Sequence, residues 1–358
     1  RPGKKDFTST LGHSRELGRL LGRNVKWVDD IYGKKALTAI ENMEDGDLLM
    51  LNNVRMDEGE MTTKGDFVAM SETMMVQNLS MIADAFVNDA FACAHRSSPS
   101  IVGFTNVLPC IAGELMNYEL SKLGQALENP KRPCIAVLGG IKVDDSVVVA
   151  DNMLRGGISD HIWVTGGVAN LFLHLSGIDL GELNVNFLKN EIKEKWGETV
   201  AIASALLKDF PECIIMPSDV ALNITGNRVD HPLKDLPIEA PIFDLGITSI
   251  QSLSKAIKSA GTIILNGPAG VFELSDFALG TIEMLNACAE SEGYAVMGGG
   301  HTATLVSQRG LADKMGHVST GGGASLELLA GRTLPGLASL EESAKQFRFS
   351  ISKPLEHQ

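Results

Sequence analysis

The chain has 358 residues, of which 44% are hydrophobic and 21% are charged, and its formal net charge at pH 7 is −13. A chain of this length normally divides into two domains, and its composition is that of an ordinary soluble globular protein. The acidic balance argues against nucleic acid as a partner, because binding a phosphate backbone needs a basic surface, but it permits a small anion in a local basic cleft.

Strands and helices alternate along the first third of the chain. Apolar side chains recur at helical spacing in Leu11–Leu21, in 37–43 and over about 65–80. Short apolar or alternating runs predict strands at 25–28, 47–51 and 84–91. Strands that alternate with helices form parallel sheets with helices on both faces, so the predicted fold class is α/β.

A long amphipathic helix is predicted over 112–128. It ends at Asn129-Pro130, and a new apolar strand, Cys134–Leu138, follows shortly afterwards. A helix that ends at proline before a new strand indicates a domain boundary. We therefore expect an N-terminal lobe (1–111), a connecting helix and hinge (112–132), a C-terminal lobe (133–335), and a tail (336–358) that packs back on the N-terminal lobe.

The second half repeats the alternation, with glycines after its strands. Further strands are predicted at 162–165, 213–216, 262–265 and 294–297, and helices at 145–155 and 337–347. The glycines stand at 139–140, 166–167, 267 with 270, 298–300 and 321–323. Each could simply make a tight strand-to-helix turn, but ligands of open parallel sheets bind outside these strand ends, which favours a nucleotide site. Neither GxxxxGK[ST] nor GxGxxG follows a strand, so neither a Walker-type nor a dinucleotide site is indicated.

The two triple-glycine turns, 298–300 and 321–323, are the strongest phosphate signal. Each follows a short apolar run and opens a helix-prone segment, and free N–H groups at a helix start attract anions. Thr302, Ser319 and Thr320 add hydroxyl donors. We expect a cradle for nucleotide phosphates.

Lys142 directly follows the glycine pair at 139–140 and Ile141. A lysine there can offset the charge that develops during phosphoryl transfer, although a solvated surface lysine is the alternative. No Ser-His-Asp or Cys-His grouping has local motif support. Without a nucleophile, we expect direct transfer between two bound anions.

Arg55 and Arg96 lie just beyond apolar strands of the first half. The arginine fork matches phosphate and carboxylate oxygens two at a time, although a lone arginine at a strand end is more often a salt-bridge partner. His95 could assist, and Arg1 lies in a turn of similar character. Together these residues predict an anion site separate from the nucleotide site.

The five cysteines are widely spaced and form no CxxC pair. They predict reduced thiols, with neither disulfides nor a zinc site. No apolar run approaches the roughly 18 residues of a membrane helix, and no signal peptide is evident. We therefore expect a cytoplasmic protein without a membrane partner.

Six ordered segments resemble the phosphoglycerate kinase family, most of all its archaeal branch. They are LNNVR (51–55), NDAFACAHR (88–96), GGIKV (139–143), NGPAGVFE (266–273), GGGHTAT (298–304) and HVSTGGGASLELL (317–329). The resemblance runs from Arg1 to the turn at 334–336. It implies two Rossmann-like three-layer α/β/α lobes with parallel sheets, joined by a long helix.

The resemblance also implies a reaction, which is reversible phosphoryl transfer between ATP and the carboxylate of 3-phosphoglycerate, giving 1,3-bisphosphoglycerate and ADP in glycolysis or gluconeogenesis. The N-terminal lobe would bind 3-phosphoglycerate and the C-terminal lobe ATP or ADP. Mg2+ would be bound mainly through the nucleotide phosphates, without metal ligands from the chain. A monomer or homodimer is expected.

The residue patterns and the resemblance together assign three groups of residues. The resemblance, carried over position by position, gives most of them, whereas His95 and the glycines at 139–140 and 166–167 come from the patterns described above. The acid-binding group is Arg1, Arg55, Arg96 and His95. The group at the transferring phosphoryl is Lys142, Gly321 and Gly322. The nucleotide-binding group is Gly139, Gly140, Lys142, Gly166, Gly167, Gly246, Asn266, Pro268, Glu273 (at the ribose), Gly299, Gly300, His301 and Thr302.

The chain departs from the family pattern at several points. His301 stands where an Asp often assists the nucleotide-bound Mg2+, Ser146 where many members have a second lysine, and Asn52 where a Glu is usual. The family's opening strand and the Ser-His-Leu-Gly before Arg1 are missing from the sequence, so we expect an N-terminally truncated chain with an incomplete acid-binding site.

Two other functions stay open. A non-catalytic nucleotide-binding relative would keep the cradle and lose the chemistry, as His301 and Ser146 suggest. An NAD-dependent dehydrogenase has a similar two-lobed layout, but the missing GxGxxG argues against it.

Overall fold

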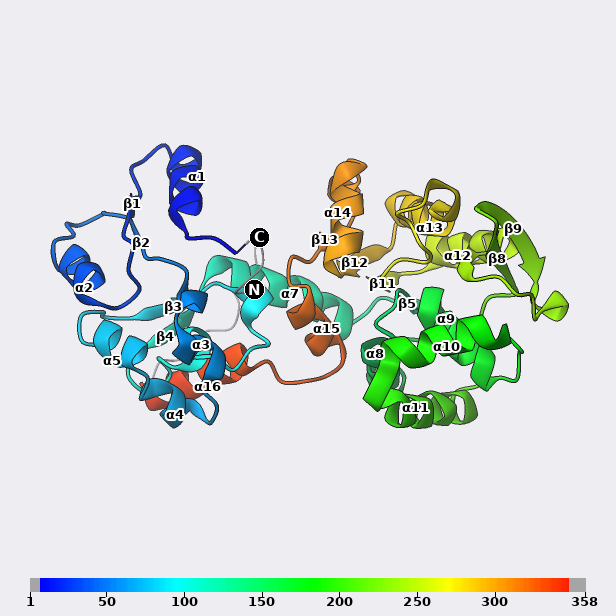
Figure 1. The fold of residues 1–358 in the computed structure, drawn as a ribbon, viewed down its shortest axis with the longest axis horizontal. Helices are drawn as coiled ribbons and strands as arrows, with labels where there is room; N and C mark the ends of the chain where they lie inside the picture. Colours follow the sequence, from blue (N-terminus) through cyan, green and yellow to red (C-terminus); the bar gives the residue numbers. More distant parts are fainter. Residues whose placement is uncertain (1–6, 348–358) are drawn as a thin grey trace. The chain divides into compact units, whose positions relative to one another are not determined.

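The computed structural model describes residues 7–347, apart from the side chain of His301. The chain divides into two packed units. Unit 1 contains the residues up to 117 and those from 333 onwards, and unit 2 contains residues 118–332 (Figure 1). Helix α7 (Glu114–Leu127) crosses the first boundary.

Unit 1 contains short helices around two small parallel pairs of strands. Strand β1 (Lys26–Trp27) pairs with β2 (Leu49–Met50), and β3 (Phe86–Asn88) pairs with β4 (Cys110–Ala112). The helices are α1 (Leu11–Leu21), α2 (Lys34–Glu41), η1 (Val54–Met56), α3 (Glu58–Thr62), α4 (Phe67–Ser71), α5 (Met74–Ser80), η2 (Phe91–Cys93), α6 (Pro99–Val102) and α16 (Pro335–Gln346).

Two predicted elements of unit 1 are wrong in extent. The helix expected over 65–80 is divided into α4 and α5, because Thr73 has an extended backbone (φ −64°, ψ 144°) and its hydroxyl donates to the Met70 carbonyl. Such side-chain bonds compete with helical ones. The strand expected over 84–91 is limited to β3, since Phe91 begins the 3-10 turn η2.

The core of unit 1 joins its middle segments to the C-terminal helix. Phe104 stacks on Phe86 with ring centroids 4.8 Å apart. Helix α16 packs against β4 and α6, and its buried Ser343 accepts a hydrogen bond from the Cys110 N–H at 3.0 Å. Residues that precede and follow unit 2 in the sequence therefore pack together in unit 1.

The main sheet of unit 2 has six parallel strands in the order β13-β12-β11-β5-β6-β7. These strands are β5 (Cys134–Leu138), β6 (His161–Val164), β7 (Ile214–Ile215), β11 (Thr262–Asn266), β12 (Tyr294–Gly298) and β13 (His317–Val318). The central strand β5 is buried at all five positions, as expected for a parallel strand covered on both faces.

The longer helices of unit 2 alternate with these strands. They are α8 (Val143–Arg155), α9 (Gly166–Leu175), α10 (Gly181–Ile192), α11 (Trp196–Asp209), α12 (Ile247–Ser259), α13 (Leu279–Glu290), α14 (Gly300–Gln308) and α15 (Gly323–Leu329). Helices α12 and α13 pack together, and their apolar side chains form one core with strands β5, β11 and β12.

Unit 2 also has an antiparallel sheet that the sequence analysis did not predict. Strand β8 (Asp219–Ile224) lies between β10 (Ile242–Leu245) and β9 (Asn227–Pro232). The β8–β9 hairpin turns at Thr225-Gly226, both with positive φ. That geometry usually takes Asn or Asp at the first position, so Thr225 gave no hairpin signal.

Unit 2 begins at residue 118, inside the predicted connecting segment 112–132, and it ends at residue 332, three residues before the predicted end of the lobe at 335. The first turn of α7 is counted with unit 1, where the Met116 N–H donates to Asp89 Oδ1 at 2.9 Å and the Gly113 N–H donates to the Asn88 carbonyl. At the other end, the Gly336 N–H donates to the Ala94 carbonyl at 2.8 Å. These capping bonds tie both ends of the linker regions to unit 1.

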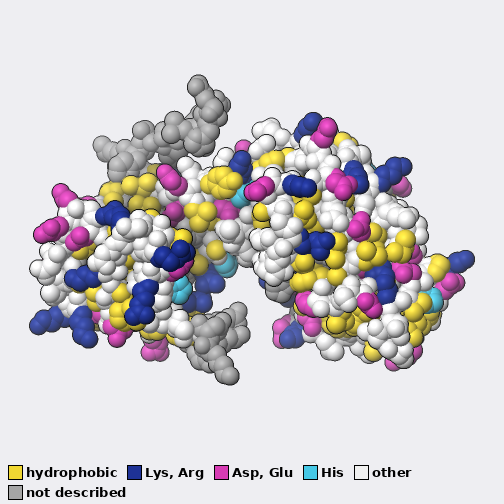
Figure 2. Space-filling view, turned by 90° about the horizontal axis from the view of Figure 1, so that it is seen from above, with side chains coloured by type: hydrophobic (Ala, Val, Ile, Leu, Met, Phe, Trp, Pro, Cys, Tyr) yellow, Lys and Arg dark blue, Asp and Glu magenta, His cyan; other side chains and the backbone are white. Residues whose placement is uncertain are grey.

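The surface is mixed in charge. On the face drawn in Figure 2, acidic and basic side chains are interspersed on both units. Within residues 7–347, no helix is long and apolar enough to cross a membrane.

Candidate nucleotide and anion sites

A cavity of about 1110 Å³ lies in unit 2, outside the carboxyl ends of its parallel strands. The glycines that follow β5, β11 and β12 line it, together with the starts of α8, α9, α14 and α15. The predicted site residues that line it are Gly139, Gly140, Lys142, Gly166, Gly167, Asn266, Pro268, Glu273, Gly299, Gly300, Thr302 and Gly322.

The glycine pairs at 139–140 and 166–167 let neighbouring backbone segments approach each other closely. The Gly140 N–H donates to the Pro268 carbonyl at 2.8 Å, and the Gly167 N–H donates to the Gly140 carbonyl at 3.0 Å. A Cβ on Gly139 would overlap the Pro268 carbonyl. The N–H groups of Gly139, Gly140 and Gly167 are therefore used within the chain, and these glycines form the cavity wall as bare backbone.

The start of α14 has the features of an anion site. Gly299 has φ +93°, which lets the chain turn from β12 into the helix. The Gly300 N–H has no acceptor within the described residues. The Thr302 hydroxyl is buried, lines the same cavity and also has no partner there. A buried hydroxyl without a partner is costly unless a ligand satisfies it.

The second triple-glycine turn is held from behind by Glu119 of α7. The Glu119 carboxylate, 1% exposed, accepts bonds from His317 Nε2 (2.7 Å), Ser319 Oγ (2.8 Å) and the Thr320 N–H and hydroxyl (2.8 and 2.7 Å). Burial alone would raise the pKa of Glu119, but these hydrogen bonds lower it to about 2. The network fixes the turn, with its outer residues facing the cavity.

The sequence analysis predicted that Gly321 offers a free N–H group, but the structure differs. Its N–H donates to Ser319 Oγ at 3.1 Å, and Gly321 does not line the cavity. Gly322 (φ +50°) and Gly323 line it, and their N–H groups have no acceptor within the described residues. The available donors of this turn are therefore one residue further along the chain than expected.

Lys142 stands at the N-cap of α8, on the cavity wall. Its side chain is exposed and forms no ion pair within residues 7–347. The neighbouring Asp144 is held instead by Lys195, at 2.5 Å. The ammonium group of Lys142 therefore adds a positive charge to a wall that also contains the starts of several helices.

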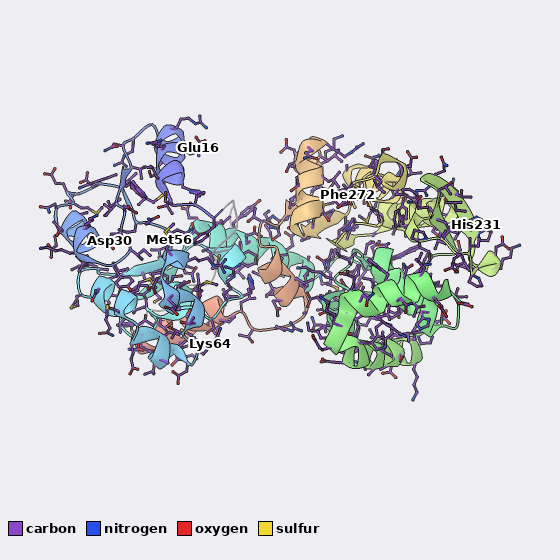
Figure 3. The ribbon with its side chains drawn as sticks, viewed as in Figure 1. Glu16, Asp30, Met56, Lys64, His231 and Phe272 are labelled. Carbon is purple, nitrogen blue, oxygen red and sulfur yellow. The ribbon has the colours of Figure 1, made fainter. Side chains whose placement is uncertain are left out.

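The cavity also has an apolar part, hereafter its apolar end, which sequence reasoning largely missed. Leu183 and Phe187 come from α10, and Pro241 to Asp244 from the segment entering and forming β10. Phe272, labelled in Figure 3, and Glu273 lie on the loop after β11. This combination suits a flat apolar ring with a polar attachment. Nothing local in α10 signals it, because exposed Leu and Phe are also common on ordinary helices.

Gly246 is not among the lining residues. It is the N-cap of α12, and a Cβ there would overlap the Asp219 side chain. Asp219 accepts the Thr248 and Ser249 N–H groups at 2.9 and 2.8 Å. The absence of a side chain at Gly246 therefore lets Asp219 cap this helix. The predicted contact between Gly246 and the nucleotide stays a prediction, because Gly246 does not line the cavity.

The arginines of the predicted acid site belong to unit 1. Arg55 lies in η1 and Arg96 follows η2, both half-buried, with His95 beside Arg96. Neither arginine forms an ion pair within the described residues, whereas Arg19, Arg132, Arg155, Arg228 and Arg332 all do. Arg1 lies outside the described residues, as does the side chain of His301. Within residues 7–347, neither arginine therefore shows the salt bridge that the alternative interpretation expects.

Asn52 has a structural explanation. It is 8% exposed, its oxygen accepts the Thr10 and Asn53 N–H groups, and its Nδ2 donates to Asp29 Oδ1 at 2.6 Å. A Glu at this position would bring a second carboxylate to Asp29. Asn53 in turn caps η1 by accepting the Arg55 N–H at 3.1 Å.

An α/β unit whose strand-end cavity has unused helix-start N–H groups, a lysine and an apolar extension is the framework of a nucleotide-binding protein. The comparisons specify the family. The family model for phosphoglycerate kinase matches residues 1–332. The phosphoglycerate kinase of Methanothermobacter thermautotrophicus is 46% identical over 343 residues, which cover 96% of this chain and 82% of that protein.

Solved structures agree. The phosphoglycerate kinase of Pyrococcus horikoshii OT3 is 38% identical with a TM-score of 0.87, over 97% of this chain and 85% of that one. That of Coxiella burnetii is 29% identical with a TM-score of 0.74, over 96% and 84%. The chain belongs to the phosphoglycerate kinase family, which is a family of kinases. The predicted family and α/β fold are confirmed, and the dehydrogenase alternative is wrong.

Proposed function

We propose that this chain transfers a phosphoryl group reversibly between ATP and the carboxylate of 3-phosphoglycerate. A carboxylate oxygen attacks the γ-phosphorus, the bond from phosphorus to the bridging oxygen of ADP breaks, and 1,3-bisphosphoglycerate and ADP form. The observation that carries the proposal is the unit 2 cavity, where the starts of α14 and α15 present unused N–H groups beside Lys142. Family membership supports the choice of substrates.

The residues of the cavity take separate roles in this proposal. The Gly300 N–H and the Thr302 hydroxyl would hold nucleotide phosphates at the start of α14. Lys142 and the Gly322 and Gly323 N–H groups would stabilise negative charge on the group in flight. The apolar end near Phe187 would hold the base. No side chain forms a covalent intermediate, so catalysis consists of positioning and charge neutralisation.

Mg2+ is proposed to enter with the nucleotide. Asp244 and Glu273 are the lining carboxylates, and Asp244 is already held by Arg228 at 2.7 Å. Within the described residues, no group of three His, Cys, Asp or Glu side chains could hold a metal ion. The lining therefore fits an ion bound through phosphate oxygens, where it would supply charge neutralisation.

The unit 1 arginines are proposed to hold the acceptor. Within the described part of the chain, Arg55 and Arg96 have no carboxylate partner, so their guanidinium forks would be available to the phosphate and carboxylate of 3-phosphoglycerate. His95 would add a further donor beside Arg96. The proposed enzyme would act in the cytoplasm, as a monomer or a homodimer.

Steady-state kinetics of two variants test the proposal. Lys142→Ala should lower kcat on the order of 10²-fold while the KM for ATP changes little, because the lysine would act mainly on charge that develops in the transition state. Thr302→Val should instead raise the Kd for ATP, since it removes a hydroxyl that the bound nucleotide would satisfy. Lys208→Ala, an exposed lysine of the same unit outside the cavity, is the matched control.

Two outcomes would contradict the assignment. An unchanged kcat in Lys142→Ala would remove Lys142 from the transfer step. Normal ATP binding without any turnover of 3-phosphoglycerate by the full-length protein would favour the non-catalytic relative.

A further inference from the structure

Glu60, outside the sites described so far, cross-links two segments of unit 1. It lies on α3 and is 8% exposed. Its Oε1 accepts the hydroxyls of Ser98 (2.8 Å) and Ser100 (2.7 Å), and its Oε2 accepts the Ser100 N–H at 2.9 Å. Its place in the chain lies between Met56 and Lys64, which are labelled in Figure 3. One buried carboxyl group therefore joins α3 to the start of α6.

The two segments that Glu60 joins carry Arg55 and Arg96, which form no ion pair within residues 7–347. Arg55 lies five residues before Glu60, and Arg96 lies two residues before Ser98. Helices α3 and α6 contact each other, and α3 also contacts η1, which contains Arg55. A change in the spacing of α3 and α6 would therefore be transmitted to the backbone at both arginines.

Each segment is rigid on its own side of the cross-link. Asp57 caps α3 by accepting the Glu60 N–H at 3.2 Å, and it is held by the Tyr32 hydroxyl at 2.9 Å. On the other side, the Ala94 carbonyl accepts the Gly336 N–H, and Ser98 is the N-cap of α6. The hydrogen bonds of Glu60 are thus a polar connection between two segments that are already fixed internally.

We propose that Glu60 is a positioning residue that sets the separation of Arg55 and Arg96 for the acidic substrate. The proposal rests on the proposed function, in which these arginines bind 3-phosphoglycerate. The negative charge of Glu60 opposes the binding of an anion nearby, so the residue assists binding only through geometry. Removing Glu60 therefore has two opposite effects on the KM for 3-phosphoglycerate: losing its negative charge lowers this KM, and losing its hydrogen bonds raises it.

The test compares KM for 3-phosphoglycerate among four variants of the full-length protein. Glu60→Ala should raise this KM on the order of tenfold and leave the KM for ATP unchanged, because a small misplacement of substrate-binding groups is costly. Glu60→Gln should restore a KM near wild type, since its oxygen can accept the Ser100 N–H while its NH2 donates to both hydroxyls. The double variant Ser98→Ala, Ser100→Ala keeps the carboxyl group, loses two of its three bonds and should raise the same KM.

Glu58→Ala is the matched control, because Glu58 is an exposed residue of the same helix whose side chain forms no hydrogen bond within residues 7–347. It should leave the KM for 3-phosphoglycerate unchanged or lower it. The proposal is overturned if Glu60→Ala lowers that KM or leaves it unchanged, or if the KM for ATP rises in parallel. A Gln variant no better than Ala would also overturn it.

Arg55→Ala and Arg96→Ala separate this inference from the function beneath it. If neither changes the KM for 3-phosphoglycerate, the acceptor site itself is wrong. If both raise it while Glu60→Ala does not, the acceptor site stands and the role of Glu60 alone fails.

Discussion

Replacing Glu119 with Gln should destabilise unit 2 by about 3 kcal/mol at pH 7. The native hydrogen bonds lower the pKa of Glu119 from 4.5 to about 2, a difference of about 2.5 pKa units. At about 1.4 kcal/mol for each unit, the charged form gains about 3 kcal/mol in the folded state. Because the side chain is 1% exposed, solvent does not screen this gain. Gln resembles the protonated acid and loses it.

The pH dependence gives the prediction its sign. A pKa that folding lowers contributes stability above the unfolded value of 4.5, and this stability is lost as the pH falls towards 2. The difference between wild type and Glu119→Gln should therefore be constant above about pH 6 and fall to between about 1 and 1.5 kcal/mol near pH 3.

Urea unfolding measures this difference in a Trp27→Phe background. That change removes the tryptophan of unit 1 and leaves Trp163 and Trp196 to report on unit 2. Glu114→Gln, an exposed glutamate of the same helix, should change the free energy of unfolding by less than about 0.5 kcal/mol. A Glu119→Gln effect that is equally large at pH 7 and near pH 3 would refute the argument from its ionised hydrogen bonds.

Two further substitutions test the local geometry of each unit. Gly267→Ala should destabilise unit 2 by about 2 kcal/mol or more in urea unfolding, because Gly267 has φ +88° and an added Cβ would overlap the Gly139 carbonyl; Gly197→Ala, which meets no atom within 4 Å, should not destabilise it. Asn52→Glu should destabilise unit 1 by about 1 to 3 kcal/mol, since it opposes a carboxylate to Asp29. Adding Asp29→Asn should recover most of that loss, and a failure to recover would contradict the explanation of Asn52.

Local sequence patterns predicted the bounds of those helices and strands that end at a glycine or a proline. Helix Leu11–Leu21 has its predicted bounds because Gly22, in the left-handed conformation, ends it. Strand Cys134–Leu138 also has its predicted bounds, since it is a short apolar run between proline and two glycines. The antiparallel strands β8–β10 were missed, as their alternation is weak and Thr225 does not resemble a usual turn residue.

The candidate site was predictable where backbone shape alone defines it, and not where distant side chains do. The glycines after β5, β11 and β12 could be placed on one cavity because parallel strands end at one edge. The apolar contribution of α10 and the carboxyl group of Glu60 could not be placed. Glu60 meets Ser98 across 38 residues, and no local pattern encodes that contact.

The two triple-glycine turns show this difference most directly. By sequence they are equivalent, each three glycines before a helix. In the structure, Gly299 and Gly300 line the cavity. The N–H group of Gly321 instead donates to Ser319, whose hydroxyl donates to Glu119, 200 residues earlier in the chain. The free donors of the second turn are therefore those of Gly322 and Gly323. In the proposed function, a turn that a buried carboxylate holds in place would keep its N–H groups fixed for the phosphoryl group during transfer. The first turn, whose Thr302 hydroxyl still lacks a partner within the described residues, is suited to binding a stable phosphate.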